Sequence, residues 1–151
     1  MKKIGFTLVE IMVIVALIAL LTAIALPNLL RARLHANESL VQSALRSIVT
    51  AEVTYRISNA TYATLTQLGE SVPAYVDLIL GCAEPPCLKH SYNFDIADIS
   101  GVTFFAYAVP LNANRSGIRS FCVTEDGVVR FQAAGGAITD RDSCLALSAT
   151  Q

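Results

Sequence analysis

Residues 1–30 of the chain read MKKIGFTLVEIMVIVALIALLTAIALPNLL. Residues 11–30 of this stretch include no charged side chain, and almost all of them are apolar. At about 1.5 Å of rise per residue, a helix of this length spans roughly 30 Å, the thickness of the hydrocarbon core of a bilayer. The stretch therefore predicts a membrane-spanning helix near the N-terminus.

The short basic start is also typical of a secretory signal peptide. Such a peptide has an apolar run of about 7–15 residues followed by a cleavage site of small residues. Here the run is longer, and residues 27–33 contain no such site. Neither a signal peptide nor a plain anchor explains Glu10, because a carboxylate near the start of an apolar span costs about 2–3 kcal/mol or more. Glu10 is therefore predicted to have a partner of opposite charge.

Cleavage of the chain after Gly5 would supply that partner. The cut would leave a new α-amino group on Phe6, one helical turn before Glu10. Within one helix the amine and the carboxylate could meet, whereas between staggered helices their pairing would set the register.

The order Gly5-Phe6-Thr7-Leu8-Val9-Glu10, followed by the apolar run, resembles the class III signal sequence of type IV pilins and type II secretion pseudopilins. In that family a prepilin peptidase cuts after the glycine and N-methylates the new first residue, and the glutamate is required for assembly. The resemblance therefore implies cleavage between Gly5 and Phe6, N-methylation of Phe6 and an assembly role for Glu10.

Pro27 also resembles the family, which often has a proline near this point of the helix. A proline removes one backbone donor and clashes with the preceding turn, so it kinks or locally melts a helix. In a filament this would make the helix extensible. The alternative is that Pro27 merely marks the exit from the membrane.

Beyond residue 33 the pattern changes from uniformly apolar to amphipathic, with apolar side chains at spacings of three and four. We therefore expect one long helix over residues 7–57. Residues 62–69 and 74–80 are expected to form short helical turns. Turn signals at residues 113–117 and 125–127 separate runs typical of strands. These runs are residues 91–96, 103–109, 118–123 and 128–133.

The expected fold class is α+β, a long N-terminal helix packed on a small antiparallel sheet of three or four strands, as in type IV pilins. The expected segments are a leader peptide at 1–5, a transmembrane and assembly helix at 6–30, the amphipathic half of the same helix at 31–58, and a globular head at 59–151. The tail, residues 146–151, is expected to be mobile.

Four cysteines lie outside the apolar run, at Cys82, Cys87, Cys122 and Cys144. An even number of cysteines beyond a membrane segment indicates disulfides in an oxidising compartment, which places the N-terminus in the cytoplasm. Four cysteines allow three connectivities, and spacing does not choose among them. Pilins often have a disulfide near the C-terminus, and this resemblance favours Cys122–Cys144, with Cys82–Cys87 closing a tight loop. A zinc site of Cys82, Cys87 and His90 is the alternative, although its spacing matches no standard finger.

The composition gives little support to catalysis or nucleic-acid binding. The formal net charge is −1, so the chain has no basic field that would attract nucleic acid. His35 and His90 have no evident nucleophile or acid beside them in the sequence, and no cofactor is expected. The acidic residues in the C-terminal part are candidate calcium ligands, but they match no EF-hand pattern. These are Glu125, Asp126, Asp140 and Asp142.

The resemblance implies a non-enzymatic structural subunit that forms a homo-oligomeric helical filament. Its partners would be the membrane, which a single-pass precursor spans, the prepilin peptidase and methyltransferase, and an assembly platform with its ATPase. The precursor would lie in the inner membrane, and the product would be an extracellular pilus. One alternative is a periplasmic pseudopilus of a type II secretion system. The other is a membrane-anchored binding module that never polymerises, but an anchor gains nothing from Glu10.

Overall fold

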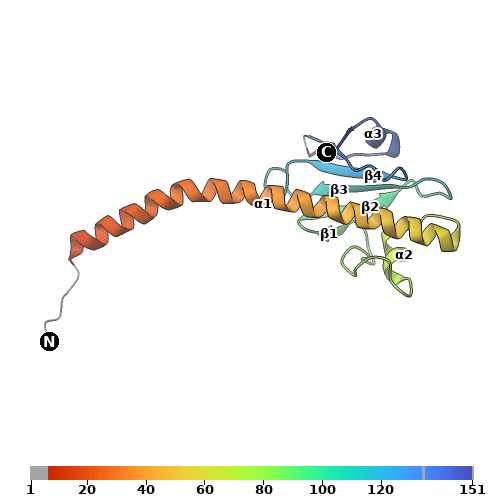
Figure 1. Ribbon diagram of the computed structural model, residues 1–151, viewed down its shortest axis with the longest axis horizontal. Coiled ribbons are helices and arrows are strands. Elements are labelled where there is room, and N and C mark those ends of the chain that lie inside the picture. Colours follow the sequence, from red (N-terminus) through yellow and green to blue (C-terminus); the bar gives the residue numbers. More distant parts are fainter. Residues whose placement is uncertain (1–6, 134, 151) are drawn as a thin grey trace. The chain divides into compact units, whose positions relative to one another are not determined.

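The computed structural model describes residues 7–133 and 135–150. Figure 1 shows a long helix, a sheet and the short helices α2 and α3. In chain order the elements are α1 (Leu8–Asn59), α2 (Leu65–Glu70), β1 (Cys87–Lys89), β2 (Tyr92–Ala97), β3 (Phe105–Pro110), β4 (Ser120–Thr124), β5 (Arg130–Gln132), α3 (Arg141–Leu145) and β6 (Ser148–Ala149). The chain divides into two compact units after Arg33, so the second half of α1 belongs to the same unit as the sheet. This arrangement confirms the α+β fold class.

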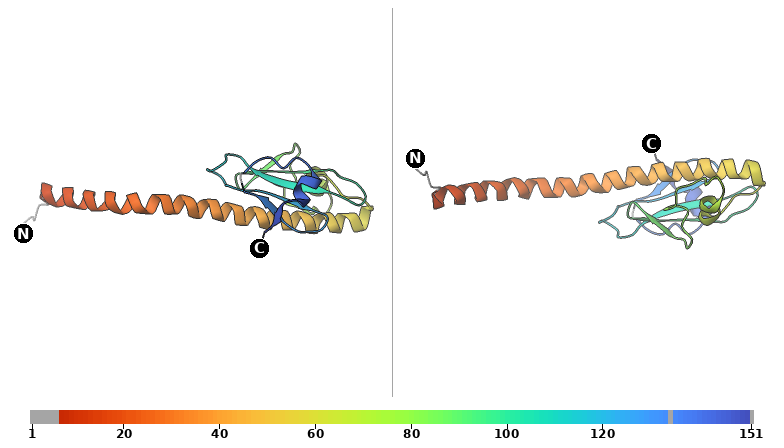
Figure 2. Two further views of the ribbon diagram at one scale, coloured as in Figure 1. Left: turned by 90° about the horizontal axis from the view of Figure 1, so that it is seen from above. Right: turned by 90° about the horizontal axis from the view of Figure 1, so that it is seen from below.

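The second half of α1 packs on the sheet through one apolar stripe. Val41, Leu45 and Ile48 are fully buried, and their spacings of four and three place them on one face of the helix. Phe94 and Phe121 of the sheet belong to the same core, and both views of Figure 2 show the sheet on one side of this half of the helix. Burying each such side chain contributes roughly 1.5–3 kcal/mol, so the stripe holds the helix on the sheet.

The sheet is antiparallel and has six strands in the order β1 to β6, more than the three or four expected. The four expected strands are β2 to β5, with ends shifted by one or two residues. The two others are the short edge strands: β1 has three residues and β6 has two, too few for a visible alternation. The expectation of a mobile tail is wrong for its described part. Ala149 pairs with Arg130, and the Thr150 N–H donates to the Val129 carbonyl at 2.9 Å.

The first expected helical turn is α2, with shifted bounds, and the second is a single turn closed by the bond from the Gly81 N–H to the Asp77 carbonyl at 2.8 Å. Helix α2 begins at Leu65 because Thr64 caps it: the Thr64 hydroxyl accepts from the Gln67 N–H at 3.2 Å, and the Gln67 side chain accepts from the Thr64 N–H at 2.9 Å. Such a capping box fixes the first turn of a helix and ends the preceding chain in an extended conformation. Residues 74–80 contain turns and no helix.

Glu38 joins α1 to the loop between β3 and β4. Its side chain is buried, and Oε1 accepts from the backbone N–H groups of Ile118 and Arg119, each at 3.0 Å. Oε2 accepts from two guanidinium nitrogens of Arg119, at 3.0 and 2.7 Å. Burial alone would raise the pKa of Glu38, but these hydrogen bonds outweigh it and the pKa is lowered. Glu38 is therefore a buried carboxylate whose charged form is stabilised by hydrogen bonds from Ile118 and Arg119.

We expect Glu38→Ala to lower the free energy of unfolding by about 2–3 kcal/mol, because two backbone donors and a guanidinium lose their acceptor. Urea denaturation of the full-length protein in detergent, followed by near-UV circular dichroism, measures this loss. Glu70→Ala is the matched control, since Glu70 is exposed on α2. Equal midpoints for Glu38→Ala and the control would contradict the role given to Glu38.

Glu52 is a second buried carboxyl on α1, and it has far fewer partners. Its side chain is fully buried, Oε2 accepts from the Ala63 N–H at 2.9 Å, and Oε1 has no partner among the described residues. Burial raises the pKa of Glu52, and the single bond from Ala63 offsets this only in part, so the pKa is about 7. The folded head therefore keeps Glu52 protonated to a higher pH than the unfolded chain does.

This raised pKa predicts a pH-dependent stability. The folded pKa of about 7 lies above the ordinary value of 4.5, so the folded state binds the proton more tightly than the unfolded state does. The contribution of Glu52 is fully present below pH 4.5 and is lost as the pH rises through about 7. Urea midpoints at a series of pH values should fall across this window in the parent protein and fall less in Glu52→Gln. Parallel curves for the two proteins would show that Glu52 does not titrate in this range.

Candidate assembly site

Helix α1 begins with a capping box made by Thr7 and Glu10. The Glu10 N–H donates to the Thr7 hydroxyl at 3.2 Å, and the Thr7 N–H donates to Glu10 Oε2 at 3.5 Å. These bonds satisfy two of the N–H groups that the first turn of a helix leaves without a partner. This role of Thr7 is not among those predicted above. Its signal was present, since a threonine three residues before a glutamate and an apolar run is the sequence pattern of a capping box.

The capping box holds the Glu10 carboxylate at the N-terminal end of α1. A carboxylate is favoured there by the partial positive charge of the helix N-terminus. The Glu10 side chain is nevertheless exposed, and the bond that its carboxylate accepts from the Thr7 N–H is long. The group is thus oriented by its own helix and open to a cation supplied from outside it.

Gly5 and Phe6, the residues of the expected cleavage and N-methylation, lie outside the described residues. The structure therefore places neither the bond to be cut nor the amine that the cut would create. Both roles stay predictions.

Every side chain from residue 8 to residue 30 is exposed. Of the helices in the described ranges, only α1 is long and apolar enough to cross a membrane. The polar group of Thr22 is satisfied within the helix, where its hydroxyl lies 3.0 Å from the carbonyls of Ile18 and Ala19. This half of α1 consequently offers an almost wholly apolar surface to lipid or to other helices.

Pro27 lies inside α1, which continues through it without a break in its helical assignment. Proline has no N–H to donate, so the carbonyl of Ala23 lacks its usual partner. At the next residue along the helix, the Asn28 side-chain amide donates to the Ile24 carbonyl at 3.3 Å. The expected kink or local melting at Pro27 stays a prediction about the assembled state.

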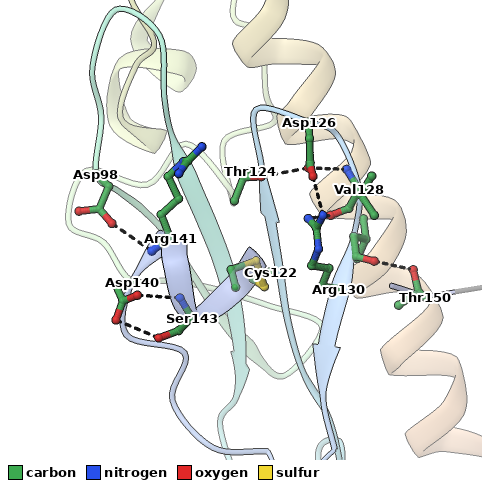
Figure 3. Close-up of a disulfide and its surroundings, with 12 residues drawn as sticks. Asp98, Cys122, Thr124, Asp126, Val128, Arg130, Asp140, Arg141, Ser143 and Thr150 are labelled. Carbon is green, nitrogen blue, oxygen red and sulfur yellow. Dashed lines mark hydrogen bonds and ion pairs between the residues drawn. A yellow bond between two sulfur atoms is a disulfide. The ribbon is translucent and has the colours of Figure 1, made fainter. Parts of the chain in front are cut away.

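All four cysteines form disulfides, Cys82–Cys87 and Cys122–Cys144, the pairing that the sequence analysis favours. Cys82–Cys87 closes a short loop before β1. Cys122–Cys144 joins β4 to α3 (Figure 3). The buried side chains of Phe105 and Ile138 belong to the same core cluster as these two cysteines. In the chain-entropy model a loop of this size contributes about 3 kcal/mol. No cysteine thiolate is left to bind zinc, so the structure does not support the zinc site.

Three of the four candidate calcium ligands, Glu125, Asp126 and Asp140, are bonded to protein donors, and Figure 3 shows the bonds of Asp126 and Asp140. Asp140 caps α3 by accepting from the Ser143 N–H at 2.8 Å. Asp126 Oδ1 accepts from Val128 at 2.9 Å, its Oδ2 pairs with Arg130, and Glu125 pairs with Arg141. Within the described residues no group of three or more His, Cys, Asp or Glu could hold a metal ion. These carboxylates instead stabilise the turns on which α3 and β5 depend.

The two histidines lie on different elements of the fold. His35 is exposed on α1, and His90 stands in the turn between β1 and β2. His90 lines a pocket of about 310 Å³ together with Asp77, Lys89 and residues of α1. The Asp77 carboxylate is paired with the Lys89 ammonium rather than with His90.

Comparison with known proteins bears on the same N-terminal segment. Residues 1–26 match the family model described as the prokaryotic N-terminal methylation motif. Over 111 residues the chain is 39% identical to the type IV wide pilus major component PilA4 of Thermus thermophilus, covering 70% of this chain and 81% of that protein. Over 51 residues it is 37% identical to the type IV major pilin protein PilA of Myxococcus xanthus, covering 34% of this chain and 23% of that protein. The first of these similarities extends well beyond the N-terminal motif.

The capping box can be tested in the purified full-length protein in detergent micelles. Thr7→Val removes the acceptor for the Glu10 N–H, a loss of about 1 kcal/mol. Exchange of the Glu10 amide hydrogen should therefore accelerate about fivefold. Thr7→Ser keeps a capping hydroxyl and should retain the parent rate. If valine and serine give the same rate, Thr7 does not cap α1.

Proposed function

This chain belongs to the type IV pilin family, and we propose that it is the major subunit of a pilus that polymerises through the first half of α1. The family is structural, and the chain acts as a building block rather than as an enzyme. The observation that carries the proposal is Glu10: a carboxylate held by its own helix at the head of an exposed apolar span. Such a group is costly in lipid and useful only when a cation meets it.

Processing comes first in the proposed sequence of events. The precursor spans the inner membrane with Lys2 and Lys3 in the cytoplasm and the disulfide-bonded head outside. A prepilin peptidase then cuts between Gly5 and Phe6 and methylates the new amine of Phe6. The product carries a cation one helical turn before Glu10.

Assembly follows when a platform with its ATPase lifts the subunit out of the membrane. The apolar side chains of α1 exchange lipid for the helices of neighbouring subunits, so the apolar surface remains covered. Glu10 meets the Phe6 amine of a neighbour, and this pairing offsets the cost of burying either charge alone. The capping box supports this step because it presents the carboxylate at the end of the helix where the neighbour's amine would lie.

Pro27 has a proposed role in the same transition. Because it donates no hydrogen bond, the helix around it needs less energy to unwind than a regular segment does. Local melting there would let the two halves of α1 adjust separately, one to the filament core and the other to the sheet of its own head.

The two other functions weighed from the sequence receive less support. A pseudopilin of a secretion system shares the N-terminal motif, but the two relatives described above are named as pilus components. Three of the candidate calcium ligands, Glu125, Asp126 and Asp140, are bonded to protein donors instead. A membrane anchor that never polymerises would not need Glu10.

We expect Glu10→Ala to insert into the membrane as the parent does and to form at least about a hundredfold fewer filaments, because a buried, unpaired amine costs several kcal/mol. Quantifying the protein in membrane and sheared-filament fractions of the producing cells separates the two steps. Thr22→Ala, a polar-to-apolar change in the same span, should leave both fractions unchanged. Normal filaments from Glu10→Ala would show that the carboxylate has no part in assembly.

A further inference from the structure

The chain makes a compact loop between α2 and the first disulfide. The backbones of Gly69 and Gly81 touch at its base: a Cβ atom on Gly81 would lie 2.4 Å from the Cα atom of Gly69. Only glycine allows such an approach from both sides. Residues 70–80 thus leave and return at one point, which is the geometry of an Ω-loop, a type of loop that is frequently functional. We refer to residues 70–80 as the Ω-loop.

The Ω-loop is anchored from within. Val76 is 7% exposed and Leu80 is 1% exposed, and both belong to the core beneath it. Asp77 Oδ1 accepts from the backbone N–H groups of Ile79 and Leu80, each at 3.0 Å, and Asp77 also pairs with Lys89 of β1. The loop's conformation is therefore held by the head itself.

This anchored loop presents apolar side chains to solvent. Val72 is 98% exposed and Leu78 is 85% exposed, and Ile79 beside it is exposed as well. Two exposed carboxylates flank them in the sequence, Glu70 and Glu84, and neither forms an ion pair with any described residue. Three apolar side chains exposed on one anchored loop are a feature of interaction sites. The partner surface should be apolar and basic.

The loop between β3 and β4, residues 111–119, has that character. Leu111 is 49% exposed and Ile118 is 41% exposed, and between them Arg115 is exposed and forms no ion pair with the described residues. This loop is anchored too, because the Asn37 amide of α1 donates to the Ser116 carbonyl at 2.9 Å. The head thus carries two anchored loops of opposite charge, and each of them exposes apolar side chains.

We propose that the Ω-loop of one subunit docks on the β3–β4 loop of a second copy of this chain. The inference rests on the proposed function, since it places the contact between heads in a filament. The two surfaces consist of different residues, so their pairing is heterologous and leaves one free surface at each end. Such a contact repeats along an open filament, and the charge pairing of the acids with Arg115 would set its register.

Cross-linking of full-length protein in intact filaments tests this contact. Val72→Cys and Ile118→Cys are combined in one chain, and a bis-maleimide joins the new thiols while the native cysteines stay in disulfides. Denatured filaments should give a ladder of dimers, trimers and longer products, and each single variant should give monomers. Val102→Cys with Ile118→Cys is the matched control, since Val102 is also exposed, at 66%. Filaments without a ladder, or an equal ladder from the control pair, would overturn the proposal.

A second variant keeps the proposal testable if the cysteine pair forms no filaments. Leu78→Asp alters an exposed side chain, so we expect a normal membrane pool and about tenfold fewer sheared filaments, whereas Val102→Asp should leave both unchanged. Filament yields equal to the parent's in Leu78→Asp would contradict the inference. If Glu10→Ala polymerised normally, the proposed function itself would fail. A missing ladder in filaments that still depend on Glu10 refutes only the docking of the heads.

Discussion

The rest of this structure depends on a helix half whose apolar side chains are all exposed and whose first turn carries a carboxylate. Residues 8–30 of α1 need an apolar environment, and Glu10 needs a cation within it. Lipid meets the first need and leaves the second unmet, whereas a bundle of identical helices with charged N-termini meets both. The capping box of Thr7 and Glu10 orients the carboxylate before any neighbouring subunit arrives.

The head is built to remain folded while that helix half changes its surroundings. Its core closes with the second half of α1, through Val41, Leu45 and Ile48, and the chain divides into units after Arg33. Glu38 locks this half of the helix to the β3–β4 loop, and the Cys122–Cys144 disulfide holds α3 on the other face of the sheet. Extraction of the first half from a membrane therefore need not disturb the sheet.

Much of this fold was predictable from local patterns, and the remainder depends on contacts between distant residues. The periodicity of α1 and the turn signals around β4 sufficed for the helix and for four strands. The short strands β1 and β6 form by pairing with their neighbours β2 and β5, and α3 is tied to β4 by the Cys122–Cys144 disulfide. A short stretch of sequence does not show such contacts between distant residues. The burial of Glu38 depends on donors that lie 80 and 81 residues further along the chain. At the site, Glu10 was found because a charge in an apolar run is anomalous, but the capping role of Thr7, although readable, was missed.

The proposed assembly requires a methylated amine at Phe6 beside Glu10. Intact mass and N-terminal sequencing of the protein from filaments sheared off its own cells would detect this amine. We expect a chain that begins at methylated Phe6 and is four hydrogens lighter than its all-thiol form, because both disulfides are present. A chain that still begins at Met1, or that is cut after residue 30, would show that no such amine forms.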